Sequence, residues 1–66
     1  MSTIRITELR IAAGMTKTEL ARRAGINERT VRNIESGVYE PSLATARKLA
    51  GALGVPFDEL FEPAST

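Results

Sequence analysis

Two short helical patterns with only three residues between them constrain the fold of this chain more than any other feature. In LARRAGINERTVRNI, residues 20–34, apolar and small residues recur at helical spacing: Leu20, Ala21, Ala24, Ile26, Val31 and Ile34. Gly25 can end the first helix because glycine adopts positive φ without strain, and Asn27 can cap the next helix. Helices joined so closely must cross at a steep angle, which requires a small residue such as Ala21 at the approach. The segment therefore predicts a helix-turn-helix.

Capping residues indicate where these two helices begin. Thr16 and Glu19 form a capping box, in which the hydroxyl and the carboxylate satisfy amide donors at a helix start. This pattern predicts a helix over residues 17–24. The helix that follows Asn27 is expected over residues 28–36.

Three further helices are expected around this pair. The first spans residues 3–13 and directs one face inward, made of Ile6, Leu9, Arg10 and Ala13. Another runs from the Ser42 cap to Gly54 with an apolar face made of Leu43, Ala46, Leu49, Ala50 and Leu53. Pro56 can start a short fifth helix that packs Leu60, and Phe57 or Phe61, onto the core. No stretch alternates with period two, so the predicted fold is all-α, a compact five-helix domain.

The composition excludes several classes of function. The chain has no Cys and no His, which removes disulfides, thiolate ligands, the commonest metal ligand and the usual general base. We therefore expect no enzyme activity, no cofactor and no metal site. No window approaches the roughly 20 apolar residues of a membrane span, so a soluble, cytoplasmic protein without a membrane partner is expected. Its 66 residues allow one domain, over residues 1–61, with a short flexible C-terminal tail at residues 62–66.

Charge is distributed unevenly along the chain, although the formal net charge is only +1. Residues 1–48 carry all nine Lys and Arg and five of the eight acidic residues. Residues 49–66 carry the other three acidic residues and no Lys or Arg. The chain therefore has a basic body and an acidic end.

Taken together, these motifs resemble the Cro and phage-repressor type of helix-turn-helix regulators, also called the XRE family. The resemblance covers about residues 6–61 and rests on ITELRIAAGMTKTELARRAGI, NERTVRNIESG, EPSLATARKLAGALGV and FDELF. It implies a lambda-repressor-like fold over residues 1–61 and a DNA-binding function. The partner implied is double-stranded DNA, and the protein would be associated with the nucleoid when bound.

The outer face of the helix over residues 28–36 is the expected base-reading surface. Once the inward positions are removed, the outward set is Glu28, Arg29, Arg32 and Asn33, with Thr30 at the margin. Arg pairs bidentately with guanine, Asn pairs with adenine, and Glu accepts a hydrogen bond from cytosine. The resemblance implies base contacts at Glu28, Arg29 and Asn33, and Arg32 is added as a base or phosphate contact. The alternatives are a merely solvated face, or pairing of Glu28 and Arg29 with neighbours on the helix.

A second set of residues is expected to contact DNA phosphates and so to position the protein on the duplex. Lys17 stands at a helix start, where free amides already attract phosphate, although family members often carry Gln there. The full set is Lys17, Thr16, Thr18, Asn27, Ser36 and Tyr39. Lys17 could instead be an ordinary surface lysine, and Tyr39 could pack under its loop.

Three neighbouring features bear on how strongly DNA is held. Residues 38–40 are Val, Tyr and Glu where the resembled proteins often place Lys or Arg, so modest affinity per monomer is expected. Arg22 and Arg23 precede the turn and are interpreted as solvated charges. Arg10 and Glu35 are both directed at a largely apolar interior, so a structural ion pair is expected, as the resemblance also implies.

One recognition helix covers too few base pairs for a specific site, which favours a homodimer on a palindromic operator with half-sites about 34–36 Å apart. The expected dimer interface is Val55, Pro56, Phe57 and Phe61. The alternative is that these residues close the core of the monomer. The predicted function is a sequence-specific transcriptional repressor, with no small-molecule ligand implied. The alternative function is a protein-interaction module, such as an antitoxin or anti-regulator, on the same scaffold.

Overall fold

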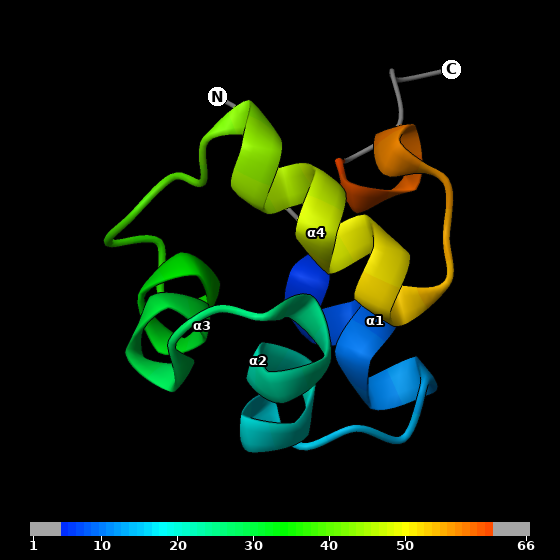
Figure 1. The fold of residues 1–66 in the computed structure, drawn as a ribbon, viewed down its shortest axis with the longest axis horizontal. Helices are drawn as coiled ribbons and strands as arrows, with labels where there is room; N and C mark the ends of the chain where they lie inside the picture. The colour runs from blue at the N-terminus through cyan, green and yellow to red at the C-terminus, as the bar shows by residue number, and fades with distance from the viewer. Residues whose placement is uncertain (1–4, 62–66) are drawn as a thin grey trace.

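Helices joined by short turns make up the computed structural model, which describes residues 5–61. The elements are α1 (Ile6–Ala12), α2 (Lys17–Ala24), α3 (Glu28–Glu35), α4 (Leu43–Leu53) and the 3₁₀ turn η1 (Phe57–Leu60) (Figure 1). The all-helical prediction is confirmed, and α2 has the predicted bounds. Helices α1 and α3 each end one residue before the predicted position. The predicted start of the first helix at Thr3 is wrong, because Arg5 is the non-helical N-cap and α1 begins at Ile6. Thr3 itself and the predicted tail at residues 62–66 lie outside the described residues.

The prediction of a fifth α-helix is wrong. Four α-helices are present in residues 5–61, and the segment after Pro56 forms a single 3₁₀ turn. Its amides bond three residues back, from Glu59 N to Pro56 O at 3.0 Å and from Phe61 N to Asp58 O at 3.3 Å. A segment of four residues is too short to form the several i to i−4 hydrogen bonds that offset the unfavourable free energy of starting an α-helix. The turn still buries Leu60 completely, as predicted.

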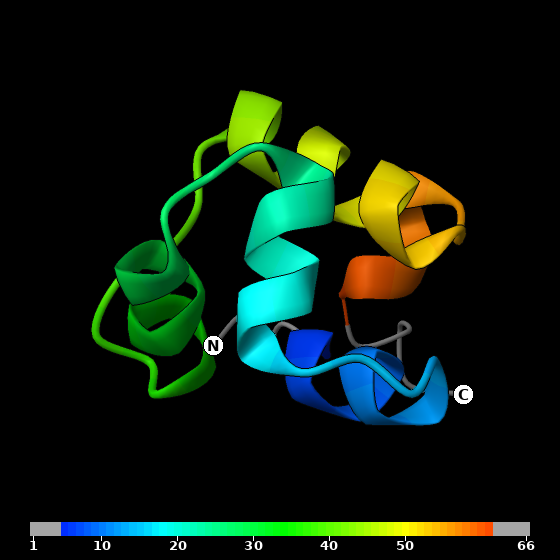
Figure 2. The same cartoon turned by 60° about the horizontal axis from the view of Figure 1, so that its bottom comes forward.

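Helix α2 lies in the middle of the fold, with α3 on one side and α4 and α1 around it (Figure 2). The core between these helices consists of Ile6, Leu20, Ala21, Ala24, Val31, Ile34, Ala46, Leu49, Ala50, Leu53 and Leu60. Two residues predicted to face inward, Ala13 and Leu43, are exposed instead. Ala13 follows the last residue of α1, and Leu43 opens α4 at an end that extends beyond the other helices (Figure 1).

The turn between α2 and α3 is fixed by backbone hydrogen bonds on both sides. The Gly25 amide donates to Arg22 O at 3.2 Å. The positive φ of Gly25, 71°, then turns the chain so that the Ile26 amide donates to Ala21 O at 3.0 Å. This pair of bonds is a Schellman motif, which ends the helix and reverses the chain. Asn27 Oδ1 then accepts from the Arg29 amide at 2.7 Å and begins α3. The angle between the two helices therefore follows from three residues, as predicted.

Two glycine substitutions test this account of the turn. We expect Gly25→Ala to lower the free energy of unfolding by about 1–2 kcal/mol, because alanine is strained at positive φ. Gly51→Ala, inside α4, is expected to raise it by about 0.5–1 kcal/mol through helix propensity. An added Cβ meets no atom within 4 Å at either site, so the expected difference in stability between the two variants does not come from steric contacts. Thermal unfolding followed by circular dichroism measures both, and equal shifts of the same sign would contradict the assignment.

Candidate nucleic-acid interface

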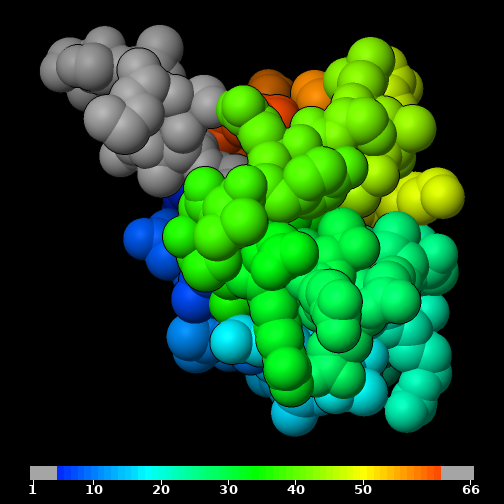
Figure 3. Space-filling model, turned by 90° about the vertical axis from the view of Figure 1, so that its left-hand side faces the viewer, coloured from blue at the N-terminus to red at the C-terminus, as the bar shows by residue number. Residues whose placement is uncertain are grey.

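Helix α3 projects from one side of the molecule, where it packs against α2 (Figure 1). Seen from that side, the green atoms of α3 occupy the middle of the surface (Figure 3). The start of α4 lies above them and the cyan atoms of α2 lie below. Val31 and Ile34 hold α3 to the core, with 0% and 2% of their surfaces exposed. The opposite side of α3 is consequently free to enter a groove.

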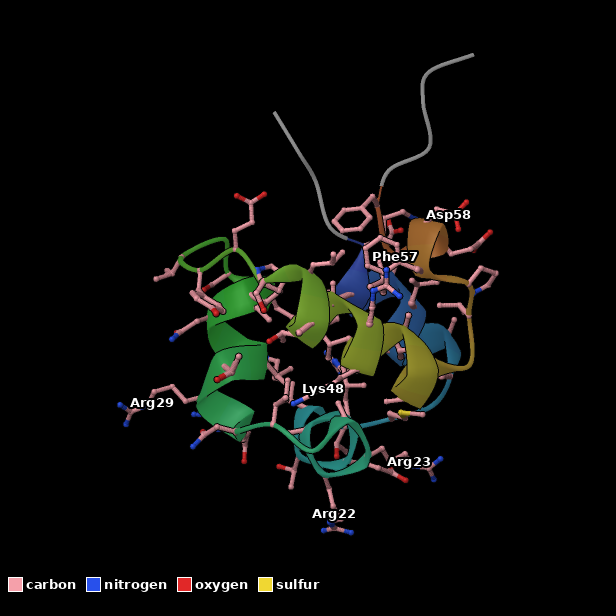
Figure 4. The ribbon with its side chains drawn as sticks, turned by 45° about the horizontal axis from the view of Figure 1, so that its top comes forward. Arg22, Arg23, Arg29, Lys48, Phe57 and Asp58 are labelled. Atoms are coloured by element: carbon pink, nitrogen blue, oxygen red, sulfur yellow. The ribbon has the colours of Figure 1, made fainter. Side chains whose placement is uncertain are left out.

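That outer side carries the residues predicted to read bases. Arg29 and Arg32 are exposed, whereas the remaining members, Glu28, Thr30 and Asn33, are half-buried. Arg29 lies opposite Val31 and Ile34 on the helix and extends away from the body of the protein (Figure 4). The five predicted residues therefore share one element, with Arg29 at the centre of its outer face.

The two arginines of α3 differ in their partners. Arg32 Nη2 donates to Glu28 Oε2 at 2.8 Å, one helical turn away, and both side chains remain accessible. Within the described part of the chain, Arg29 forms no ion pair, so all its N–H donors are available for an incoming acceptor. The sequence interpretation gave base contacts for Glu28 and a base or phosphate contact for Arg32, and left open that Glu28 pairs with a neighbour on the helix; the structure shows that this neighbour is Arg32. The i, i+4 spacing was the signal for it.

The predicted phosphate-binding residues lie at the starts of α2 and α3, at the end of α3 and, for Tyr39, in the loop that follows α3. Thr16 Oγ1 accepts from the Glu19 amide at 3.0 Å, which leaves its hydroxyl proton to donate elsewhere. Asn27 likewise uses Oδ1 for its cap and retains its NH₂ donors. Lys17 and Thr18 follow directly in the first turn of α2. This arrangement matches a helix start that attracts phosphate.

The loop after α3 is tied to the end of that helix. Asn33 O accepts from Val38 N at 2.9 Å, from Tyr39 N at 3.1 Å and from Ser36 Oγ at 3.2 Å. The Tyr39 side of this loop is open: Tyr39 is 44% exposed and Val38 is 76% exposed. Tyr39 is therefore not fully packed under the loop, although more than half of its surface is covered.

Arg10 and Glu35 join α1 to α3. Arg10 Nε donates to Glu35 Oε2 at 2.7 Å and Nη2 donates to Oε1 at 3.3 Å, with side chains only 13% and 7% exposed. Arg10 Nη1 also donates to Met15 O at 2.8 Å, in the turn before α2. One guanidinium thus connects α1, the entry to α2 and the end of α3.

The residues predicted for a dimer interface surround η1. Val55, Phe57 and Phe61 are half-buried and pack against the core, and Pro56 is exposed. The two phenyl rings meet edge to face with centroids 5.4 Å apart, and the Arg47 guanidinium lies 5.6 Å from the Phe57 ring centroid. The three half-buried side chains therefore pack within the monomer, and part of their surface remains accessible to solvent.

Arg22 and Arg23 lie away from the outer face of α3. Arg23 pairs with Glu19 at 2.9 Å, and both arginines are exposed on α2. Figure 4 shows them leaving α2 in directions different from that of Arg29. Their placement agrees with the interpretation as solvated charges.

The steep turn between α2 and α3, with an arginine-bearing outer face on the second helix, defines a helix-turn-helix DNA-binding domain. The profile of the helix-turn-helix family matches residues 6–60. The chain belongs to this family, the XRE type that includes Cro and the phage repressors, and the predicted membership is confirmed. Proteins of this family are DNA-binding transcriptional regulators rather than enzymes.

Three similar proteins illustrate the relationship. An uncharacterized HTH-type transcriptional regulator of Archaeoglobus fulgidus is 40% identical over 86% of this chain and 81% of its own length. The cryptic phage CTXphi transcriptional repressor RstR of Vibrio cholerae is 33% identical over 100% of this chain and 60% of its own length. The crystal structure of the restriction-modification controller protein C.AhdI from Aeromonas hydrophila superposes with a TM-score of 0.84. It is 38% identical and covers 86% of each chain.

No helix within residues 5–61 has the length and apolar character needed to cross a membrane.

Proposed function

We propose that this protein is a sequence-specific transcriptional repressor that binds a palindromic operator as a homodimer in the cytoplasm. The observation that supports this most directly is the outer face of α3, where Arg29, which forms no ion pair within residues 5–61, stands between Asn33 and the Glu28–Arg32 pair. These side chains are the types that discriminate base pairs in the major groove. Repression follows if the bound dimer occludes a promoter. The phage repressor among the relatives supports this direction of regulation.

Selection of bound duplexes from a random-sequence DNA pool at moderate salt, followed by sequencing, tests the proposal. We expect enrichment of a palindrome whose half-sites are about one helical turn apart, because two recognition helices of a dimer face the same side of the duplex. No enrichment by well-folded protein would contradict it. Repression itself is tested by placing the selected palindrome over a reporter promoter, where the protein should lower expression.

The dimer is expected to depend on the half-buried aromatic residues around η1. Phe57→Asp places a carboxylate in an apolar contact surface, so the apparent mass in sedimentation equilibrium should fall from that of a dimer to that of a monomer. Circular dichroism checks that the variant remains helical. Asp58→Asn, an exposed change in the same turn, is the control and should leave the mass unchanged. A folded Phe57→Asp protein of unchanged mass would exclude this side chain from the dimer contact.

The second candidate function is a protein-interaction module with weak DNA binding. It is favoured by the exposed apolar side chains Val38 and Tyr39, beside α3 where a cation would strengthen phosphate binding. Salt dependence separates the two candidates, since DNA affinity that rests on phosphate contacts falls steeply with salt. A flat salt dependence with no sequence preference would support the protein partner.

Lys17→Ala tests the proposed contact between Lys17 and a DNA phosphate. We expect weaker binding on every sequence and a log–log salt slope that is shallower by about 0.9 per protomer, because one phosphate is no longer neutralised. Arg22→Ala removes an exposed cation from the same helix and serves as the control, with an unchanged slope expected. Equal slopes for wild type and Lys17→Ala would identify Lys17 as an ordinary surface lysine.

A further inference from the structure

The contact between Glu28 and Arg32 presents a donor and an acceptor side by side on the outer face of α3. The Nη2 and Oε2 atoms are 2.8 Å apart, and the side chains are 37% exposed for Glu28 and 64% exposed for Arg32. The contact uses one of the five N–H groups of the guanidinium and one carboxylate oxygen. Further donors of Arg32 and lone pairs of Glu28 are therefore available without breaking the pair.

A G·C base pair fits this pair of side chains best. In a G·C pair, guanine O6 accepts a hydrogen bond from cytosine N4, so an acceptor and a donor lie about 2.7–3.2 Å apart in the major groove. Arg32 can donate to guanine while Glu28 accepts the second N4 proton of cytosine, which closes a ring of four hydrogen bonds. An A·T pair also places a donor, adenine N6, beside an acceptor, thymine O4, at the same spacing. Adenine N7 lies next to that donor and repels the carboxylate, and the thymine methyl group lies next to O4 and crowds the guanidinium, so A·T satisfies this pair of side chains less well.

Charge gives a second reason why the pair should act on bases. A carboxylate on the face that meets DNA is repelled by the phosphates, and a surface ion pair of this kind stabilises a helix only slightly. Glu28 therefore weakens binding to DNA in general. The repulsion between Glu28 and the phosphates is offset only where a base donates a hydrogen bond to the Glu28 carboxylate.

We infer that Glu28 and Arg32 act together as one reader of a single G·C base pair in each half-site, separate from the base met by Arg29. This inference rests on the proposed function and assigns one position of its operator. Glu28 contributes selectivity by excluding sequences without the cytosine amino group. Arg32 contributes both selectivity and affinity.

The test compares wild type with Glu28→Ala, Arg32→Ala and the double variant, each selected on random DNA and then titrated on the wild-type operator and its single-position variants. At one base pair, wild type should prefer G·C by about tenfold to hundredfold per half-site. Both single variants should lose that preference at the same position, and the double variant should lose no more than either, because the two side chains act as a unit. Glu28→Ala should also bind random DNA more tightly than wild type.

Glu19→Ala is the matched control, since Glu19 and Arg23 form the same i, i+4 pair at 2.9 Å on α2. Its base preferences should equal those of wild type. The inference alone is overturned if a palindrome is selected but Glu28→Ala keeps the G·C preference, or if the two single variants lose preference at different positions. If folded wild-type protein selects no sequence, both the inference and the proposed function are overturned.

Discussion

Arg10→Ala is expected to leave the domain mostly unfolded at 37 °C. The substitution removes three hydrogen bonds and leaves the Glu35 carboxylate, only 7% exposed, without its cation. Breaking a buried ion pair in this way costs about 3–5 kcal/mol. A folded chain of 66 residues has a total stability of about 3–10 kcal/mol, so the loss takes away a large part of it. Thermal and urea unfolding followed by circular dichroism measure the effect.

Two control variants test whether the loss of stability comes from leaving a charge buried without its partner. Arg23→Ala breaks the exposed Arg23–Glu19 pair and should change the free energy of unfolding by less than about 1 kcal/mol. The double variant Arg10→Met with Glu35→Leu replaces both buried charges by apolar side chains and should recover much of the stability lost by Arg10→Ala. A sharp unfolding transition near that of wild type for Arg10→Ala would show that the pair is not needed for the fold.

Local signals in the sequence predicted most of the helical framework. Thr16, Gly25 and Asn27 act within a few residues of their own positions, and the bounds of α2 and the start of α3 followed from them. The buried pair of Arg10 and Glu35 was also foreseeable, because two opposite charges were expected to face the same apolar interior.

Two features of the fold, the exposure of Leu43 and the 3₁₀ form of the last turn, could not be predicted, because both depend on how long each helix is relative to its neighbours. Periodicity assigns Leu43 to the inner face of α4, but it does not show that the first turn of α4 extends past the helices beneath it. Periodicity also assigns Phe57 and Leu60 to one helix, although a segment of this length closes as a 3₁₀ turn. In the candidate interface, residue types indicated base contacts one at a time. The sequence left open whether Glu28 pairs with a neighbour on the helix, and the side-chain positions identify that neighbour as Arg32.

Arg29→Ala is expected to have the largest effect on DNA binding of any single change on α3. The loss of one bidentate contact costs about 1–3 kcal/mol at each half-site. In a two-fold dimer both half-sites lose it, so affinity for the selected operator should fall by roughly 30-fold to 10⁴-fold. Helical content should be unchanged, because Arg29 is exposed and its backbone amide still bonds to Asn27 Oδ1. Fluorescence-anisotropy titration of the operator and of random duplexes measures both affinities.

Arg29→Lys distinguishes base reading from simple attraction to phosphate. Lysine keeps the positive charge but has no planar fork for guanine, so a base-reading Arg29 predicts that this variant binds random DNA like wild type and loses operator preference like Arg29→Ala. A phosphate contact predicts the opposite, with Lys restoring affinity on every sequence and no base preference changed. Because Arg29 carries no ion pair within residues 5–61, neither result can be attributed to a broken contact inside the protein. Full restoration of operator binding by lysine would remove Arg29 from the base-reading set.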